Sequence, residues 1–275
     1  QVGPRSVGLD EHARVWFTGA TRPVTEAPDF CQGEGGNAFG EYYPLPGGRA
    51  QVLVYDQTTD EIAPIDTCFS ADHNQIGNNN FIYFGQNSAV GWIDTDTWDE
   101  TQDAEASQGW GPADVDTDGD GTITEWTEPD EAIEPSKDLR IEFGCYMPSV
   151  NRVDGSVWCS GIGAEDNSLM RLELGSNPPE TCIAEVYEAP PSMSNPPIYG
   201  SGGVHIDSSG VAWQNWRGSG HLASFDRSKC DLTSGPATGQ SCPEGWTFHR
   251  RDNPTFRNAS FPINSDESYL IQVDH

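Results

Sequence analysis

The chain has 275 residues and carries 43 acidic side chains against 14 basic ones, a net charge of −29 at pH 7. A charge of this sign and size repels nucleic-acid phosphates and anionic membranes, which excludes them as partners. Aromatic residues make up 10% of the chain and no apolar run reaches the length of a membrane span, so we expect a folded domain without a transmembrane segment. The surplus of acids fits a surface adapted to salt, a protein that binds divalent cations, or both.

Seven cysteines occur without any C-x-x-C pair, which argues against a zinc ribbon or a thioredoxin-type motif. Together with the few lysines and the sequon at Asn258, they favour an oxidising, extracellular or periplasmic location. The chain begins at Gln1 without a charged and then apolar leader, as expected of a processed protein. We expect three disulfides, the first two across predicted strand pairs: Cys145–Cys159, Cys230–Cys242 and Cys31–Cys68. Cys182 is left over, and the alternative is that several of these residues are buried thiols.

In chain order, five stretches share one pattern: an alternating strand, a polar turn, and a second strand that carries an aromatic residue. The stretches begin at Ser6, His73, Val150, Gly203 and Ser260. The turn residue is Asp10, Gly77, Asp154, Asp207 or Asn264, and the aromatic residue is Trp16, Tyr83, Trp158, Trp213 or Tyr269. This pattern predicts five antiparallel hairpins.

Two further strands follow each of the first four hairpins. The third strands are predicted at 51–59, 89–97, 168–176 and 221–229, and they lead into Asp56, Asp94, Glu173 and Asp226. Closing strands are predicted at 61–66, 140–143, 184–189 and 246–250. Helix signals are nearly absent from the chain.

Units of three or four short strands that repeat along a chain predict an all-β fold, a β-propeller formed as a single domain over residues 1–275. A β-sandwich is the alternative, but it does not explain why the same turn and aromatic recur. The fifth repeat ends after its first strand pair at His275. We therefore expect part of a larger propeller, or a ring that a partner chain completes. An irregular last blade is the other interpretation.

The repeats resemble those of streptogramin-lyase-like and SMP-30-like propellers, whose blades carry a D-x-x-G-x-V/I-W-F strand pair and then an I-x-x-L/F-D-x-x-T strand. The match rests on Val15–Phe17, Asp154–Trp158, Asp207–Trp213 and the strands that end at Asp56, Asp94 and Asp226. The resemblance covers most of the chain and implies the fold. Streptogramin lyases use a metal and a His to open a cyclic ester by elimination, but their full catalytic set has no counterpart here, so the activity is not carried over.

The second repeat contains a long acidic insertion, residues 98–135, which loses strand character and is expected to form a loop region on one rim of the propeller. Within it, "DVDTDGDGTITEW" runs from Asp114 to Trp126. Ca²⁺ takes six to eight oxygen ligands, and a D-x-D-x-D-G run wraps carboxylates around one ion while glycine permits the sharp turn. The insertion therefore predicts a calcium loop, and a solvated acidic turn is the alternative.

Two registers of an EF-hand-like loop compete. The first places Asp114, Asp116 and Asp118 at positions 1, 3 and 5, Gly119 at 6 and Glu125 at 12. The second, which resembles the loop of calmodulin-like EF-hands, places Asp116, Asp118 and Asp120 at 1, 3 and 5, Gly121 at 6, the Thr122 carbonyl at 7 and Ile123 at 8. We favour the second, with Asp116, Asp118, Asp120, Thr122 and Glu128 as ligands. Thr127 occupies position 12 in place of the usual Glu, and the flanking prolines indicate an isolated loop that fixes the insertion.

A catalytic centre, if there is one, is expected where loops enter the innermost strands. Asp72, His73, Arg152 and His205 form the best polar set there, and a His can serve as a base or a metal ligand. The alternative is that these residues only hydrogen-bond neighbouring loops. The sequence thus favours a secreted, calcium-stabilised propeller that binds an extracellular ligand or assembles with other chains. The second hypothesis is a metal-dependent propeller lyase or hydrolase with a His-containing central funnel.

Overall fold

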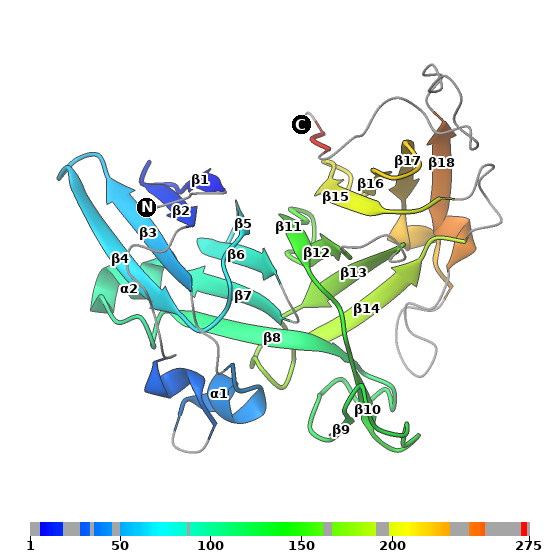
Figure 1. Ribbon diagram of the computed structural model, residues 1–275, viewed down its shortest axis with the longest axis horizontal. Coiled ribbons are helices and arrows are strands. Elements are labelled where there is room, and N and C mark those ends of the chain that lie inside the picture. The colour runs from blue at the N-terminus through cyan, green and yellow to red at the C-terminus, as the bar shows by residue number, and fades with distance from the viewer. Residues whose placement is uncertain are drawn as a thin grey trace.

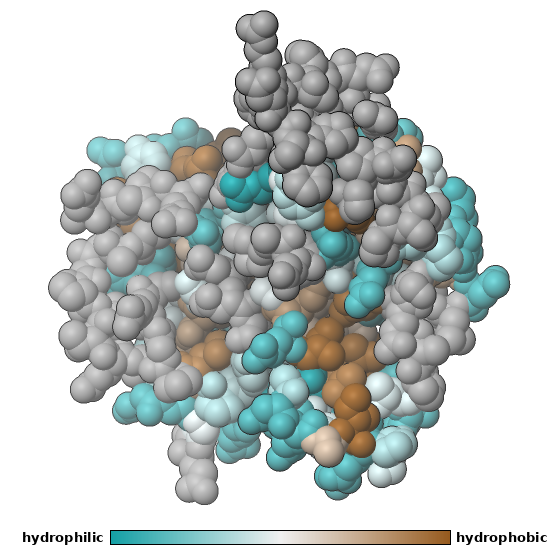
Figure 2. All heavy atoms as spheres, turned by 45° about the vertical axis from the view of Figure 1, so that its right-hand side comes forward, coloured by the Kyte–Doolittle hydropathy of each residue, from teal (hydrophilic) through white to brown (hydrophobic). Residues whose placement is uncertain are grey.

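The computed structural model describes residues 6–18, 28–33, 36–45, 50–86, 89–161, 167–190, 198–231, 242–250 and 271–273. They form four β-sheets with short helices between them, so the predicted all-β class is confirmed. Within these ranges, no helix has the length and apolar character needed to cross a membrane. On the face shown in Figure 2, hydrophilic side chains border a band of hydrophobic surface.

Strands follow chain order in the sheets, except that β10 lies between β8 and β9. The first sheet contains β1 (Val7–Leu9), β2 (Val15–Thr18), β3 (Ala50–Asp56) and β4 (Glu61–Thr67). The second contains β5 (His73–Ile76), β6 (Phe81–Gln86), β7 (Ala89–Asp94), β8 (Gln108–Val115), β10 (Asp138–Ile141) and β9 (Trp126–Thr127). The third contains β11 (Tyr146–Val150), β12 (Val157–Ser160), β13 (Ser168–Glu173) and β14 (Ile183–Glu188), and the fourth β15 (Ser201–Ile206), β16 (Ala212–Trp216), β17 (His221–Phe225) and β18 (Trp246–Arg250). The helices are α1 (Ala38–Tyr42), α2 (Thr95–Thr101) and the 3₁₀ turns η1 (Asp29–Cys31), η3 (Arg227–Lys229) and η4 (Pro243–Gly245).

The four sheets follow one another around an arc, with the first and fourth sheets at its two ends (Figure 1). The first strand of each sheet contacts the first strand of the next, in the order β1, β5, β11 and β15. Each sheet therefore extends outward from a shared inner side, as propeller blades do. The predicted propeller is confirmed, with one blade for each of the first four repeats. The alternative, a β-sandwich, would have two packed sheets and does not fit the four sheets found. The fifth repeat and the sequon lie outside the described residues, apart from 271–273.

In each of the four described hairpins, the repeated aromatic residue makes a side-chain hydrogen bond to the turn. The partner is the predicted turn residue in two of them, Asp10 and Asp207, and a nearby residue in the other two, Asn79 and Ser156. The four bonds run from Trp16 Nε1 to Asp10 Oδ2 at 2.8 Å, from Asn79 Nδ2 to Tyr83 Oη at 3.1 Å, from Trp158 Nε1 to Ser156 Oγ at 3.0 Å and from Trp213 Nε1 to Asp207 Oδ2 at 2.9 Å. Each bond satisfies a polar group of an aromatic ring that packs into the blade. The repeat is thus a local device that fixes the turn to the second strand.

The acids that end the third strands also have a local role. Asp56, Asp94 and Asp226 accept hydrogen bonds from Thr58, Thr97 and Ser228, respectively, through both backbone N–H and side-chain hydroxyl groups. Such bonds are typical of Asx turns and helix N-caps. Asp94 caps α2 in this way. The D-x-x-T element therefore ends a strand and starts a turn, and it needs no ligand to explain it.

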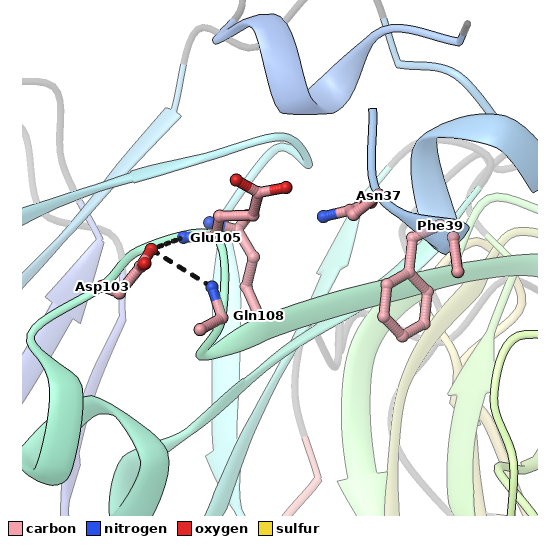
Figure 3. A pocket seen from close by; sticks show the side chains of 7 residues that line it. Asn37, Phe39, Asp103, Glu105 and Gln108 are labelled. Atoms are coloured by element: carbon pink, nitrogen blue, oxygen red, sulfur yellow. Dashed lines mark hydrogen bonds between the residues drawn. The ribbon is translucent and has the colours of Figure 1, made fainter. Parts of the chain in front are cut away.

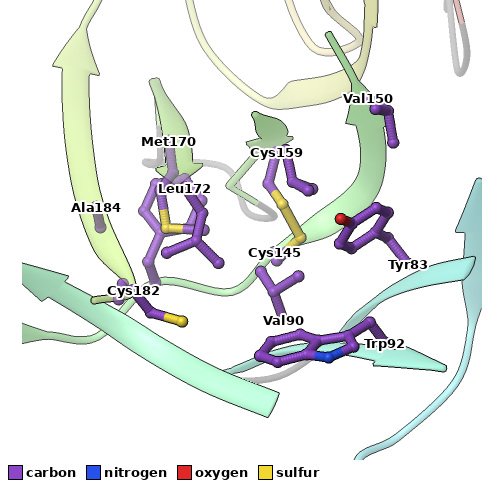
Figure 4. Close-up of a cluster of buried hydrophobic side chains, with 13 residues drawn as sticks. Tyr83, Val90, Trp92, Cys145, Val150, Cys159, Met170, Leu172, Cys182 and Ala184 are labelled. Carbon is purple, nitrogen blue, oxygen red and sulfur yellow. A yellow bond between two sulfur atoms is a disulfide. The ribbon is translucent and has the colours of Figure 1, made fainter. Parts of the chain in front are cut away.

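Hydrophobic cores lie between successive sheets. Trp16 and Trp110 belong to the core of the first and second sheets, and Trp158 and Trp216 to that of the third and fourth. Figure 4 shows the middle core, in which Val90 and Trp92 of β7 face Met170 and Leu172 of β13. Burying these faces supplies the main stabilising free energy of the fold.

The three predicted disulfides are confirmed: Cys31–Cys68, Cys145–Cys159 and Cys230–Cys242. Cys145–Cys159 joins the residue before β11 to β12 inside the middle core (Figure 4). Cys182 is free and buried in the same core, and burial raises the pKa of its thiol. This cysteine is therefore expected to be unreactive while the chain is folded.

One expectation about the acidic insertion is wrong, because residues 98–135 are not all loop. The C-terminal part of α2 falls in this range, and Gln108–Val115 form β8, whose eight residues are all buried. The closing strand of the second blade is therefore β8 and not 140–143, which overlaps β10. The glycines of β8 weaken its strand signal in the sequence. Glycine is needed at position 109 because a Cβ there would lie 2.4 Å from the ring of Trp92. Close packing, and not strand propensity, selected glycine here.

Candidate metal centre

Three carboxylates of the insertion gather directly after β8. Asp116, Asp118 and Asp120 each offer an oxygen atom, and these atoms lie within 4.8 Å of one another. Asp116 is 4% exposed, and the other two are exposed. Three like charges at such distances repel one another, and a hard cation with oxygen ligands relieves that repulsion. The structure brings together the carboxylates of the second register.

The backbone of the loop wraps around Asp116. Its Oδ1 accepts a hydrogen bond from Gly119 N at 2.6 Å, and its Oδ2 accepts one from Gly121 N at 3.0 Å. Both glycines have positive φ angles, 82° and 85°, at which other residues are strained. Asp120 Oδ1 accepts from Thr122 N at 2.7 Å, which closes the next turn. The order of aspartates and glycines therefore encodes a folded loop with its carboxylates on one side.

A fourth carboxylate, from Asp138 at the start of β10, lies beside this loop. Its Oδ1 accepts a hydrogen bond from Thr117 N at 3.1 Å, and the residue is 3% exposed. Burial, together with the charges of Asp118, Asp116 and Asp120, raises the pKa of the Asp138 carboxyl to about 6. Sequence reasoning missed this residue, because only the pairing of β10 with β8 and β9 brings it to the loop.

The other predicted ligands have different positions. Thr122 lies within the loop, where its carbonyl was expected to bind the ion, and Thr127 at the twelfth position is buried. Glu128 Oε1 accepts hydrogen bonds from Trp126 Nε1 at 2.7 Å and from Arg140 Nη1 at 3.3 Å. Glu128 thus faces Arg140, and Asp138 is the further carboxylate that is hydrogen-bonded to the loop.

Arg140 connects the flanks of the loop to α1. Its Nε lies 2.8 Å from Asp114 Oδ1 and its Nη2 3.3 Å from Asp114 Oδ2, and Tyr42 donates its hydroxyl to Asp114 Oδ2 at 2.9 Å. The guanidinium carbon lies 4.1, 4.8 and 5.2 Å from the ring centroids of Trp126, Tyr43 and Tyr42. These are cation–π distances. Because Asp114 is the buried partner of this ion pair, it is not available to the loop as the first register required.

The far side of the loop is attached to the third blade. Ile123 is fully buried, and its N–H donates to Glu180 O, in the segment between β13 and β14, at 2.7 Å. The apolar eighth position of the predicted loop is therefore an anchor between blades. An ion in the loop would hold β8, β10 and this anchor together, which is a structural role and not a catalytic one.

The residues of the predicted catalytic set come from three different blades. Asp72 is buried, and its carbonyl accepts a hydrogen bond from Thr18 Oγ1 at 3.2 Å. His73 begins β5 and packs edge-on against Tyr146 of β11, with ring centroids 5.0 Å apart. His205 Nδ1, on β15, accepts a hydrogen bond from Val273 N at 3.3 Å. Asp72 and His73 are thus adjacent at the start of β5 in the second blade, and His205 belongs to the fourth.

Arg152 lies apart from His73. It is exposed in the turn between β11 and β12, where its Nη1 donates to Asn78 Oδ1 at 3.2 Å and its carbonyl accepts from Asn78 Nδ2 at 3.1 Å. His73 is the first residue of β5, and Asn78 comes after its last residue. The length of the strand, which rises roughly 3.3 Å per residue, therefore separates His73 from Asn78 and from Arg152. Arg152 joins the turns of neighbouring blades, and the structure does not bring it to His73.

A hollow of about 390 Å³ lies between α1 and the segment before β8. Figure 3 shows Phe39 and Asn37 on one side and Asp103, Glu105 and Gln108 on the other. Asp103 Oδ1 holds its own turn by accepting from Glu105 N at 2.9 Å. The hollow combines an aromatic wall with acidic groups, a lining that suits a small ligand carrying positive charge.

No family model and no curated protein matches the chain. Among solved structures, it is similar to virginiamycin B lyase from Staphylococcus aureus, with 9% identity, a TM-score of 0.39, and coverage of 92% of this chain and 71% of the other. It is also similar to regucalcin from Agrobacterium tumefaciens, a calcium-binding protein, with 12% identity, a TM-score of 0.29, and coverage of 81% and 70%. The resemblance to streptogramin lyases and SMP-30-like propellers is thereby confirmed. At these values it transfers no activity, ligand or residue role to this chain.

Proposed function

We propose that the protein is a secreted, calcium-stabilised β-propeller that binds an extracellular ligand or assembles with other chains. The observation that carries the calcium proposal is the group of three carboxylates within 4.8 Å of one another, at Asp116, Asp118 and Asp120. Asp138 adds a buried carboxyl from a separate strand. Such an all-oxygen set suits Ca²⁺. The three disulfides support secretion, because they persist in oxidising compartments.

Calcium has a structural role here, because it cross-links the insertion to β10. Its ligands come from the loop after β8 and from the start of β10, and Ile123 ties the same loop to the third blade. Without the ion, the four carboxyls repel one another and the loop loses order. With it, the second and third blades share a rigid outer connection.

The outer face of the first sheet, whose edges are exposed although Leu53 near its centre is 2% exposed, supports the binding or assembly part of the proposal. Directly paired residues share a face of a sheet, and two such rows cross the four strands. The rows are Val7, Phe17, Leu53 and Pro64, and Leu9, Val15, Tyr55 and Ile62. Every member is apolar or aromatic, and Val7, Leu9 and Ile62 are 66%, 65% and 58% exposed. The opposite face, with Trp16, packs on the second sheet, so this face is suited to receive a further sheet.

Calcium binding is tested by melting the protein with EDTA and with Ca²⁺ in excess. At 100 times the Kd, the ion adds about 2.7 kcal/mol to the free energy of unfolding. For a chain of this size, we expect a rise of roughly 5–10 °C in Tm. A calorimetric titration measures the stoichiometry, for which one ion is expected. An unchanged Tm with no heat of binding would refute the proposal.

Three substitutions identify the acidic ligands. We expect Asp118→Asn to weaken calcium binding at least about tenfold, since it removes a formal charge from the cluster. Asp138→Asn and Glu128→Gln then form a matched pair. If Asp138 is the additional ligand, Asp138→Asn lowers calcium affinity and Glu128→Gln leaves it unchanged. If Glu128→Gln lowers calcium affinity and Asp138→Asn does not, Glu128 and not Asp138 is the additional ligand.

Assembly is tested by sedimentation of the protein and of Leu9→Glu across a range of concentrations. We expect the parent chain to associate with a second copy as its concentration rises. The introduced charge on the exposed face should abolish that association while the circular dichroism spectrum stays unchanged. A parent chain that remains monomeric throughout would leave this face to a ligand and would contradict self-assembly.

A further inference from the structure

We propose that Glu11, His12 and Asp96 form a second cation site, of the type that takes Zn²⁺ or another first-row transition ion, at the junction of the first two blades. Each of the three offers one ligand atom, and these atoms lie within 4.8 Å of one another. The residues are exposed and far from the calcium loop in the sequence. They come from the turn between β1 and β2 and from the first turn of α2.

The donor set distinguishes this cluster from the calcium loop. Imidazole nitrogen and carboxylate oxygen both bind Zn²⁺ and other first-row ions, whereas Ca²⁺ prefers oxygen ligands alone. His12 Nε2 lies 3.6 Å from Glu11 Oε1, so the ring already faces the carboxylate. The two clusters of the chain should therefore select different metals.

Asn80, in the turn between β5 and β6, sits between the two carboxylates. Its Nδ2 donates to Glu11 Oε1 at 2.9 Å and lies 3.3 Å from both Asp96 oxygens. One amide thus supplies partial positive charge to two anionic groups from different blades. An ion would supply more, and a half-turn of the amide would then present its oxygen as a fourth ligand.

A buried ion pair fixes the spacing between the two halves of the cluster. Arg14 Nε lies 2.7 Å from Asp10 Oδ2, and the guanidinium also pairs with Asp99 of α2 through Nη1. Asp10 Oδ1 accepts from His12 N at 3.0 Å, so His12 is attached to one end of this bridge. Asp96 lies one helical turn before Asp99, at the other end. The ligands are therefore held close before any ion arrives, which reduces the ordering cost of binding.

The site is tested by titrating Zn²⁺ against a fluorescent chelator, with Ca²⁺ saturating and 0.15 M NaCl present to suppress loosely held ions. We expect one Zn²⁺ site per chain. His12→Ala should weaken it at least about tenfold, and Asp96→Asn should have a similar effect. Asp60→Asn, which removes one exposed acid elsewhere, is the matched control for charge and should change nothing. Circular dichroism and urea midpoints in EDTA verify that each variant folds.

A crossed comparison with the calcium loop completes the test. Asp118→Asn should lose calcium affinity and keep its Zn²⁺ affinity, while His12→Ala should do the opposite. Equal Zn²⁺ affinity in the parent chain and in His12→Ala would overturn the proposal. So would a loss of Zn²⁺ binding in Asp118→Asn, because the ion would then belong to the acidic loop.

Discussion

At the scale of single residues, Asp10 shows how a repeated acid stabilises a hairpin. Its carboxylate accepts hydrogen bonds from Trp16 Nε1, Arg14 Nε and Arg14 N at 2.8, 2.7 and 2.9 Å. Burial favours the protonated form, but these bonds and the guanidinium charge outweigh it and lower the pKa of Asp10. Folding therefore favours the ionised form of the Asp10 carboxyl.

We expect Asp10→Asn to destabilise the protein by about 2–4 kcal/mol, because the new amide sets N–H donors against those of Arg14 and Trp16. Urea denaturation at pH 7 measures the change. Asp226→Asn is the control, since Asp226 caps an exposed turn and Asn is also a good cap. Its effect should remain below about 0.5 kcal/mol. Equal effects of the two substitutions would contradict a special role for Asp10.

The same substitution predicts a pH dependence. A carboxyl whose pKa is lowered on folding contributes stability above its unfolded value, about 3.9, and loses it as pH falls through the folded value. The difference in unfolding free energy between the parent chain and Asp10→Asn should therefore be constant between pH 5 and 7 and shrink below about pH 4. Denaturation curves at several pH values measure it. A difference that grows on acidification would show that the sign is wrong.

At the scale of elements, the insertion and β10 form an outer strap that is held in place by its own strand pairing. β8 extends the second sheet, β10 pairs with it, and the acidic loop and β9 lie between them in the chain. Arg140 on β10 ties this strap to α1 through Asp114 and three aromatic rings. Burial, followed by the charge of Asp114, raises the pKa of Tyr42, so its hydroxyl keeps its proton and donates.

We expect Arg140→Lys to destabilise the protein by about 2–4 kcal/mol although the charge is kept, because lysine cannot replace the two-pronged pairing with Asp114 or the stacking on Trp126. Trp fluorescence during urea denaturation reports the change. Arg152→Lys is the matched control, since Arg152 is exposed and its guanidinium bonds Asn78. Its cost should be below about 1 kcal/mol. A small effect at Arg140 would mean that packing of β8 alone fixes the strap.

At the scale of the whole molecule, charge opposes the compact state. The net charge of −29 makes the folded chain repel itself, and only 14 basic side chains offset this. Salt shortens the Debye length from about 10 Å at 0.1 M to about 3 Å at 1 M, so it screens repulsion across the blades. The proposed calcium ion would counter this repulsion where the insertion of the second blade meets the third, whereas each of the three disulfides links segments of a single blade.

We therefore expect the calcium-free protein to become more stable as NaCl rises from 0.05 to 1 M. A gain of about 1 kcal/mol corresponds to roughly 2–4 °C in Tm for a chain of this size. Melting in EDTA separates screening from calcium binding, and choline chloride distinguishes screening from specific sodium binding. A Tm that falls as either salt is added would show that local ion pairs, such as Arg140–Asp114, outweigh the net repulsion.

The sequence by itself determined what depends on near neighbours along the chain. The hairpins follow from alternation and turn residues, and a bond such as Asp10 to Trp16 spans only six positions. The loop register follows from glycines at positive φ next to Asp116. The disulfides Cys145–Cys159 and Cys230–Cys242 close over short segments, the first across the β11–β12 pair and the second at the ends of the connection between β17 and β18, so closeness in sequence indicates them.

Only the tertiary structure decided the contacts made across blades and strands. β8 carries glycine at position 109 because Trp92 leaves no room for a side chain there, which local propensity cannot reveal. Asp138 reaches the calcium loop through the pairing of β10, and Arg152 reaches Asn78 through the meeting of two turns. These partners lie far apart in the sequence, and packing selects them. The repeat therefore specifies the blades, and the assembled sheets specify which acids lie close together.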